Sequence, residues 1–426
     1  MTHLTHRRTK APTLLGTQLL FNVGFYAVVP FIATVLTHDF ELGGAAIGFV
    51  LGVRTFSQQG AFLLGGLLAD RFGARTMILI GCAVRCCGFL TLAASLWGPE
   101  PQLHVFLLGT VLTGFGGALF SPALSTLVAA VERHVALPHG RVTLFAWLTV
   151  LGEAGAAIGP LLGAALLPWG FAATSCAGAA LFAAVGLLLW LILPGGTPQR
   201  AQAATASVAS ATDGAPPLSK RQRTALKNPH FATFAAIHAV DLLAYNQLYL
   251  SIPTELQRVG SGSTALALVF TWVSVLTVTL QVPVARWSAR RPARICLRIG
   301  YACHASAFTL LGLCAPWTAP DGFELAPAFT AATLVTLGHL FALPTAMHSV
   351  NGFAGNAATG SYFGLLATIG GFLVLVGNIG IGSLLDHATS AQPAAALPWL
   401  CLAALPAVSA LAVTRPWIWK HTQEDG

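Results

Sequence analysis

Long apolar runs separated by short polar breaks follow one another along the whole chain. Most runs reach the roughly 20 residues that a membrane-spanning helix needs, and none shows the ~10-residue alternation of a transmembrane barrel strand. Backbone amides and carbonyls in lipid must pair within their own segment, so these runs predict helices. Division at charged or Pro/Gly-rich breaks gives twelve segments: 13–36, 45–69, 76–97, 103–131, 142–167, 171–194, 231–253, 264–287, 294–315, 326–350, 358–385 and 397–414.

The composition places the chain in a bilayer. Hydrophobic residues make up 55% of the 426 residues and charged residues only 8%, whereas soluble domains carry about 25% charged residues. The expected fold class is an all-α membrane protein with twelve transmembrane helices. The eight cysteines all fall within predicted helices, without zinc-type spacing, and are expected to be small packing residues.

The formal charge of +8 follows the predicted topology. With both termini in the cytoplasm, every Lys and Arg except Arg54, Arg85 and Arg258 falls on the cytoplasmic side, as the positive-inside rule requires. The basic excess therefore predicts orientation in a bacterial inner membrane and no nucleic-acid partner. The first apolar run follows Arg7, Arg8 and Lys10 and exceeds a signal-peptide core, so we expect an uncleaved helix.

A long polar break divides the chain. Residues 195–229 are rich in Ala, Ser, Thr, Gly and Pro and cannot bury a core, which predicts a cytoplasmic linker. It separates an N-terminal six-helix half, 1–194, from a C-terminal half, 230–426. A weak internal repeat supports this division, since the turn at 282–291 resembles the turn after the second helix, with Arg286 in the place of Asp70.

The turn after the second helix, GLLADRFGAR at 66–75, carries a family signature. It matches Gly-x-Leu-Ala-Asp-Arg-x-Gly-Arg/Lys-Arg/Lys and resembles the motif between helices 2 and 3 of major facilitator superfamily transporters. The resemblance implies two six-helix halves that alternate access. It also implies a latch on the inner face, in which the Asp meets a helix N-terminus and nearby arginines. The alternative is a turn that only fixes topology. The expected latch residues are Gly66, Asp70, Arg71, Gly73, Arg75 and Arg133.

The fifth helix carries a stripe of small residues. Gly155, Gly159 and Gly163 share one face, and Pro160 removes one backbone hydrogen bond. The stretch resembles the antiporter motif Gly-x-x-x-Gly-Pro-x-x-Gly of drug:proton exchangers. The alternative is a generic face for close helix packing.

Two further stretches narrow the resemblance. Residues 22–88 and 114–122 resemble the MdtH-type branch of bacterial drug exporters, some of whose relatives secrete siderophores. The resemblance implies proton-driven export across the inner membrane. Many such exchangers have an Arg in helix 4 where this chain has Thr110, so Arg54 or Arg85 would have to supply that charge.

Acids inside apolar helices are the candidate coupling residues. An ionised carboxylate inside a bilayer costs about 2.5–3.5 kcal/mol on insertion scales, so it must be paired, protonated or turned inward. Glu153 in helix 5 is the leading candidate, with Arg54 and Arg85 as the buried cations of its half and Asp241 in helix 7 as a second proton site. The alternatives are a static Glu–Arg pair at Glu153, and a partly hydrated Asp241 near a helix end.

Other polar residues in apolar helices are candidates for a substrate cavity. His238, Asp241 and Tyr245 are spaced to share one helix face, where the Asp could fix the imidazole tautomer. Any one of these residues could instead be a helix–helix contact, and the histidines lack the close spacing of a metal site. The expected cavity residues are Asn22, Tyr26, Gln58, His238, Tyr245, His304, His339 and Asn378.

The chain has no P-loop, Ser-His-Asp order or nucleotide fingerprint. We therefore expect a monomeric secondary transporter, not an enzyme, that uses a proton gradient and no cofactor to export a small organic molecule. An amphipathic drug and a siderophore are both candidate substrates. The alternatives are a proton-coupled importer and a non-transporting receptor or assembly factor with the same fold.

Overall fold

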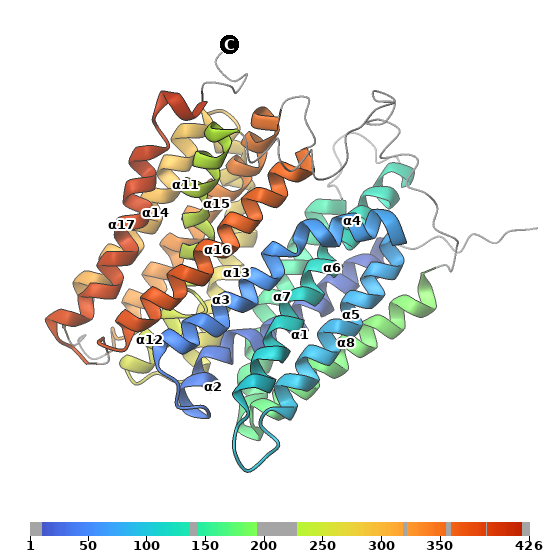
Figure 1. The fold of residues 1–426 in the computed structure, drawn as a ribbon, viewed down its shortest axis with the longest axis horizontal. Helices are drawn as coiled ribbons and strands as arrows, with labels where there is room; N and C mark the ends of the chain where they lie inside the picture. The colour runs from blue at the N-terminus through green and yellow to red at the C-terminus, as the bar shows by residue number, and fades with distance from the viewer. Residues whose placement is uncertain are drawn as a thin grey trace, which may run out of the picture.

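A computed structural model of the chain describes residues 11–135, 144–193, 228–317, 322–354, 359–388 and 390–419. All the regular secondary structure in these ranges is helical (Figure 1). The first six predicted segments correspond to α1 (Ala11–Val28) with η1 (Val29–Phe31) and α2 (Ile32–His38), α3 (Gly44–Gly60) with α4 (Phe62–Phe72), α5 (Ala74–Ala94), α6 (Leu103–Val135), α7 (Leu144–Leu166) with η2 (Leu167–Trp169), and α8 (Phe171–Ile192).

The remaining segments follow in the same order. They are α11 (Pro229–Asn246) with α12 (Ser251–Arg258), α13 (Ser263–Ser288), α14 (Ala293–Cys314), α15 (Ala326–Ala354), α16 (Thr359–Leu385), and η3 (Pro393–Ala396) with α17 (Leu397–Ala412) and η4 (Pro416–Trp419). Among the described residues, ten helices are long and apolar enough to cross a membrane. The other two predicted segments are the helix pairs α3/α4, broken at Ala61, and α11/α12. The helical class and the succession of segments are thus confirmed.

The seventh segment departs from the expectation at its end. Glu255 and Arg258 lie beyond the predicted segment 231–253, but both belong to a helix, α12, where Arg258 Nη2 lies 2.7 Å from Glu255 Oε1. At the start of the segment, the side chain of Asn228 accepts a hydrogen bond from Phe231 N at 3.1 Å and Pro229 begins the helix. This is the standard arrangement for a helix N-terminus.

The helices form two groups that meet along a seam. Figure 1 shows α11 and α14–α17 on one side and α1 and α4–α8 on the other. Across the seam, α3 packs against α16 and α7 packs against α13. The expected linker, 195–229, lies outside the described residues except for its last two, so the boundary between the halves stays a prediction.

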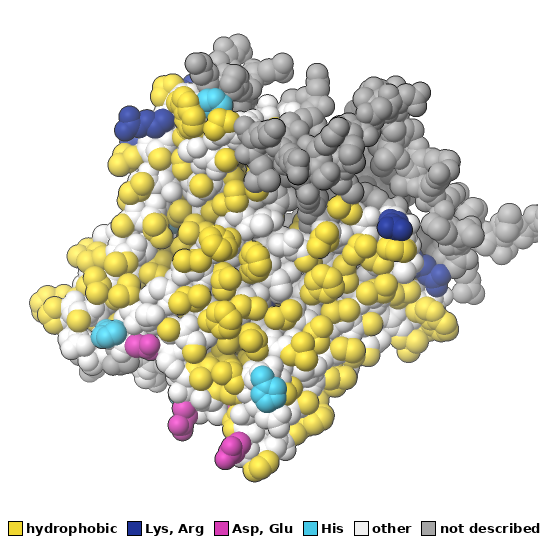
Figure 2. Space-filling model, viewed as in Figure 1, with side chains coloured by type: hydrophobic (Ala, Val, Ile, Leu, Met, Phe, Trp, Pro, Cys, Tyr) yellow, Lys and Arg dark blue, Asp and Glu magenta, His cyan; other side chains and the backbone are white. Residues whose placement is uncertain are grey.

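The outer surface suits lipid. Large apolar side chains are exposed around the bundle, such as Trp190 at 58% and Val408 at 64%. On the face seen in Figure 2, apolar side chains cover the middle, basic side chains lie at one end and acidic ones at the other. We call the end with α2, α12 and Asp386 the acidic end. The basic end is the one that carries the α4–α5 and α13–α14 turns.

Candidate functional site

Asp241 on α11 is the centre of a buried cluster in the C-terminal half. Its side chain is 2% exposed and receives two hydrogen bonds, from His304 Nε2 on α14 and His339 Nδ1 on α15, each at 2.9 Å. A carboxylate accepts both bonds only if each imidazole presents an N–H, which fixes the orientation of both rings. The side chain of His339 is 21% exposed and that of His304 is 0% exposed. The cluster therefore runs from a partly accessible histidine to an enclosed one.

This pairing differs from the expected one in two respects. Asp241 was expected to orient His238 on its own helix, but His238 Nδ1 lies 3.1 Å from the hydroxyl of Tyr301. The alternative of a partly hydrated Asp241 is wrong, because this residue is 1% exposed. Tyr245 also points to the cluster, since its ring stacks on that of His339 at a centroid distance of 4.3 Å.

Glu153 extends the cluster across the seam. Its helix, α7, packs against α13 of the other half, and the Glu153 carboxylate lies within electrostatic range of His339. Directly before it, the carbonyl of Gly152 accepts a hydrogen bond from Asn22 Nδ2 at 2.8 Å. We call Glu153, Asp241, Tyr245, His304 and His339 the central cluster. It joins ionisable groups of both halves.

The two buried arginines form no ion pair with the central cluster, although Arg54 lies over the ring of Tyr249, at 5.4 Å from its centroid. Arg54 and Arg85 are 4% and 2% exposed, and both guanidinium groups lie over the ring of Phe25, at 5.6 and 4.5 Å from its centroid. Arg85 also lies 4.4 Å from the ring centroid of Phe21. No described carboxylate forms an ion pair with either of them, so the static Glu–Arg pair considered for Glu153 is absent from this part of the structure. The position at which many exchangers have an arginine holds Thr110, whose hydroxyl donates to the carbonyl of Phe106 at 2.9 Å.

Asn378 belongs to a chain of amide contacts between the halves. It donates to Asn246 Oδ1 at 2.9 Å and accepts from Gln247 Nε2 at 3.0 Å. Asn246 Nδ2 in turn donates to Thr55 Oγ1 on α3 at 3.0 Å. Asn378 is 0% exposed and fully engaged, so in this structure it serves as a helix–helix contact. We call Thr55, Asn246, Gln247 and Asn378 the amide network.

The glycine stripe of α7 faces α1. A Cβ atom added at Gly155 would lie 2.8 Å from the Cβ of Asn22, and one at Gly159 would lie 2.7 Å from the Cβ of Tyr26. Gly163 likewise packs on α1, and Pro160 is buried inside the helix. The stripe therefore allows the backbones of α7 and α1 to approach each other closely along the part of α7 that follows Glu153. Of the other cavity candidates, Tyr26 lies with Tyr249 beside the ring of Phe270, and Gln58 is half-buried beside Gly114.

The expected latch is only partly within the described structure. Gly73 has a φ of 88°, a conformation that favours glycine and turns the chain from α4 into α5. Arg75 Nη2 donates to the carbonyl of Trp190 at 3.1 Å, Arg71 lies over the ring of Phe72, and Gly66 borders open space. The side chains of Asp70 and Arg133 lie outside the described residues, so their pairing stays a prediction.

At the acidic end, opposite the expected latch, the halves are joined by Asp386, an acid that the sequence did not single out. Asp386, directly after α16, accepts a hydrogen bond from the first amide of α3, Gly44 N, at 2.6 Å. A carboxylate at a helix N-terminus is stabilised by the free amides and the helix dipole. This contact ties the two halves together at the acidic end.

Comparison with known proteins decides the family. The model of the Major Facilitator Superfamily matches residues 14–378. The chain belongs to the major facilitator superfamily. It is therefore a multi-pass membrane transporter and not an enzyme, as expected.

Curated relatives support the same assignment for this transporter. It is 31% identical over 384 residues to an uncharacterised MFS-type transporter of Mycobacterium tuberculosis, which covers 88% of this chain and 85% of the relative. It is 30% identical over 414 residues to the multidrug resistance protein MdtH of Salmonella newport, which covers 96% of this chain and 94% of MdtH. The expected resemblance to the MdtH branch is thus confirmed.

Solved structures share the fold at low identity. The nucleoside transporter NupG superposes with a TM-score of 0.73 at 16% identity, covering 95% of this chain and 98% of NupG. A peptide transporter POT in complex with sulfate gives 0.73 at 14% identity, covering 99% and 97%. Both confirm the architecture.

Proposed function

We propose that this transporter exports a small organic molecule across a bacterial inner membrane in exchange for protons. The observation that carries the proposal is the central cluster, in which Glu153 of one half interacts with His339 of the other and His339 is hydrogen-bonded to Asp241. Groups that bind protons and sit on the seam between two moving halves are suited to couple protonation to alternating access. The relationship to MdtH supports export of a drug-like molecule; a siderophore is the other candidate.

The proposed cycle starts from the structure described above, which we interpret as a state closed at the acidic end. The Asp386–Gly44 contact joins α16 to α3 at that end, and the amide network joins α3 to α11 and α16. Protonation of Glu153 removes its attraction to His339 and weakens the seam, which favours rearrangement of the halves. The basic excess supports an orientation with the basic end and both termini in the cytoplasm. Asp70, Arg71 and Arg133 would then form the inner latch that closes in the opposite state.

The cargo would lie beside the central cluster between the halves. Tyr26, Tyr245 and Tyr249 offer rings and hydroxyls there, and His339 is the partly exposed polar group. Arg54 and Arg85 carry positive charge with no described carboxylate beside them. We therefore assign them a role in binding the cargo or in controlling the conformational change. Substituting Arg85→Gln should then alter the apparent affinity for cargo while the dependence on the pH gradient persists.

Transport by purified protein in proteoliposomes tests the proposal. Candidate drugs and siderophores are loaded, and efflux is followed with the pH gradient imposed in either direction. The matched pair of variants is Glu153→Gln and Glu100→Gln, since Glu100 is an exposed acid in a loop. Export that responds to the gradient, is lost in Glu153→Gln and survives in Glu100→Gln supports the proposal. Gradient-driven accumulation in the cytoplasmic direction would favour an importer, and no movement of any candidate would favour a receptor.

A further inference from the structure

Arg54 on α3 and Arg85 on α5 are two buried cations that the proposed proton coupling does not use. They are 4% and 2% exposed, and Arg85 lies within electrostatic range of Arg54. Arg85 fits into the bundle because α6 has glycines beside it, and a Cβ atom added at Gly116 or Gly117 would collide with its side chain. No described carboxylate forms an ion pair with either arginine. Two like charges thus lie inside the N-terminal half without a described acid to balance them.

The aromatic rings around these arginines leave part of each guanidinium group unsatisfied. Three rings lie against Arg85, with centroids 4.4, 4.5 and 5.6 Å from its Cζ: those of Phe21, Phe25 and Phe182. A ring face attracts positive charge, but it does not replace a hydrogen-bond acceptor for N–H groups. Arg54 Nε, Arg85 Nε and Arg85 Nη1 are buried and have no hydrogen-bond partner among the described residues. Because a buried donor without an acceptor is unfavourable, these groups favour a bound anion.

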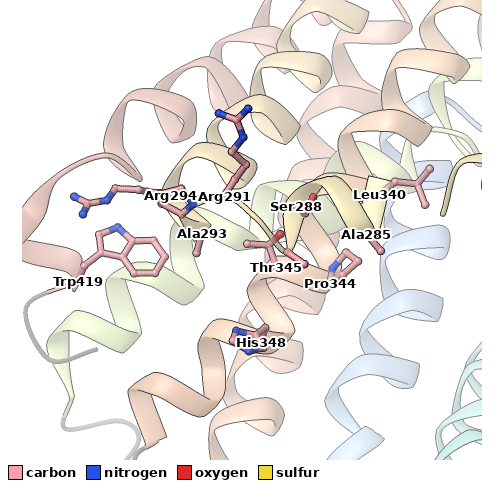
Figure 3. Close-up of a pocket in the computed structure, with 12 residues that line it drawn as sticks. Ala285, Ser288, Arg291, Ala293, Arg294, Leu340, Pro344, Thr345, His348 and Trp419 are labelled. Atoms are coloured by element: carbon pink, nitrogen blue, oxygen red, sulfur yellow. The ribbon is translucent and has the colours of Figure 1, made fainter. Parts of the chain in front are cut away.

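The arginines at the basic end of the C-terminal half have different surroundings. Arg291 borders a cavity of about 530 Å³ there, and its side chain is directed away from that of His348 (Figure 3). It is exposed, and its guanidinium group lies over the ring of Trp287, at 5.1 Å from the centroid. Water can solvate this group, whereas the surroundings of Arg54 and Arg85 largely exclude water. Burial without an acceptor therefore sets the arginines of the N-terminal half apart.

We propose that Arg54 and Arg85 bind the acidic group of the cargo, so that the transporter exports amphipathic organic anions. This assignment rests on the proposed export of a small organic molecule and names its chemical class. Guanidinium groups bind carboxylates through paired, charge-assisted hydrogen bonds. The phenylalanine rings beside them suit an apolar body next to that charge and offer no polar contact to a hydrated inorganic ion. An anion that leaves a cell with a negative interior also moves with the membrane potential.

Access to Arg54 depends on the seam between the halves. The ring of Tyr249, from the C-terminal half, lies 5.4 Å from Arg54 Cζ, so separation of the halves uncovers this guanidinium group. Arg54 Nη2 also donates to Thr55 Oγ1 at 3.2 Å, and the same hydroxyl oxygen accepts from Asn246 Nδ2 at 3.0 Å. An acid that draws Arg54 away from Thr55 would therefore act on the amide network. Cargo binding would in this way promote opening of the seam.

Isothermal titration of the purified full-length chain in detergent, at neutral pH and without a gradient, tests the proposal. The probes are benzoate, naphthoate and decanoate, each compared with its uncharged amide. At least one acid should bind about tenfold or more tightly than its amide, and Arg54→Gln and Arg85→Gln should each weaken its binding about thirtyfold or more. Arg85→Lys keeps the charge but not the planar fork, so it should retain part of the binding. The control Arg298→Gln removes the same charge from an exposed position of α14 and should bind like wild type.

Thermal unfolding separates a binding role of Arg85 from a structural one. A buried charge without an acidic partner is unfavourable, and replacing it with an apolar side chain of similar length should be neutral or stabilising. Arg85→Met should therefore melt at or above the wild-type temperature when no probe is present, and it should lose acid binding. A clearly lower melting temperature would assign Arg85 to the packing of the rings and overturn the proposal.

The titration also distinguishes this proposal from the proposed proton exchange. No preference of any acid over its amide, or equal loss of binding in Arg298→Gln, would overturn the anion site. If sodium chloride at the same concentration displaces the acids, the site selects charge alone and the cargo assignment is wrong. Acid binding by a protein whose transport ignores the pH gradient would support the anion site and contradict proton exchange. Gradient-driven export without any preference for acids would contradict the anion site alone.

Discussion

His339 Nδ1 and Asp241 Oδ2 lie 2.9 Å apart, and the other oxygen of the same carboxylate receives His304 at the same distance. Three helices, α11, α14 and α15, thus converge on one buried acid. Of Asp241, His304 and His339, only His339 is partly exposed, and it also interacts electrostatically with Glu153 across the seam. The two histidines therefore share a partner but have different surroundings.

This difference predicts different effects of two matched substitutions. His339→Gln should reduce proton-coupled transport at least tenfold, because it breaks the link between Glu153 and Asp241. His304→Gln should reduce stability more than coupling, since His304 is enclosed and its Nδ1 has no partner among the described residues. Thermal unfolding in detergent and gradient-driven flux in proteoliposomes measure the two effects. Equal loss of coupling in both variants would contradict the assignment of proton coupling to His339 and of a mainly structural role to His304.

Removing the shared acid should destabilise the fold. Asp241→Asn replaces an acceptor of two hydrogen bonds with a group that accepts at one atom only, and disruption of a buried charge pair costs about 3–5 kcal/mol. The melting temperature should fall clearly, while Asp39→Asn, an exposed acid at the acidic end, should leave it unchanged. An unchanged melting temperature in Asp241→Asn would show that the carboxylate makes no such contacts.

The contact between Asp386 and Gly44 predicts a shift in conformation. Loss of a helix N-terminal cap by substitution with Ala costs about 0.5–2 kcal/mol, so Asp386→Ala should move the population toward states open at the acidic end by about twofold to thirtyfold. Maleimide labelling of Thr254→Cys, which lines the 260 Å³ cavity beside Asp386, reports this opening once the native cysteines are replaced. Labelling in Asp386→Ala that is no faster than in Asp39→Ala would argue against a closing contact.

The packing of α7 on α1 predicts that Gly159 does not tolerate even a small side chain. In Gly159→Ala the new methyl group would meet Tyr26 at 2.7 Å, and overpacking of this kind costs about 1–3 kcal/mol. Because the helices must separate to accept it, both the stability and the position of Glu153 should change. The control is Gly16→Ala on α1, where no heavy atom lies within 4 Å of the new carbon. Wild-type transport by Gly159→Ala would remove the positioning role of the stripe.

Much of this account was predictable from the sequence. Apolar runs predicted the helices because length and hydropathy alone decide whether a segment spans lipid. Glu153 and Asp241 stood out because an ionised carboxylate inside a membrane-spanning helix is energetically unfavourable. Their partners did not stand out, since His304 and His339 lie 63 and 98 residues beyond Asp241, and sequence does not give the rotation of each helix about its axis. The spacing of His238 and Asp241 therefore suggested the wrong pair.

Other functional residues were missed for related reasons. Asn246 and Gln247 form an adjacent polar pair inside the apolar run 231–253, a signal that could have indicated the amide network. Asp386 looked like an ordinary loop acid, because its role depends on α3 starting beside it. Arg54 and Arg85 were considered as ion-pair partners of Glu153, but their guanidinium groups lie over aromatic rings, those of Phe21, Phe25, Phe182 and Tyr249.

The most direct test of the central claim is proton movement by purified Glu153→Gln. With a pH gradient imposed across proteoliposomes, wild type should export cargo at a rate that follows the gradient, and cargo should in turn drive proton flux. Glu153→Gln should bind cargo and exchange it without a gradient, but should neither respond to the gradient nor move protons. Gradient-driven export by Glu153→Gln at the wild-type rate would contradict the account.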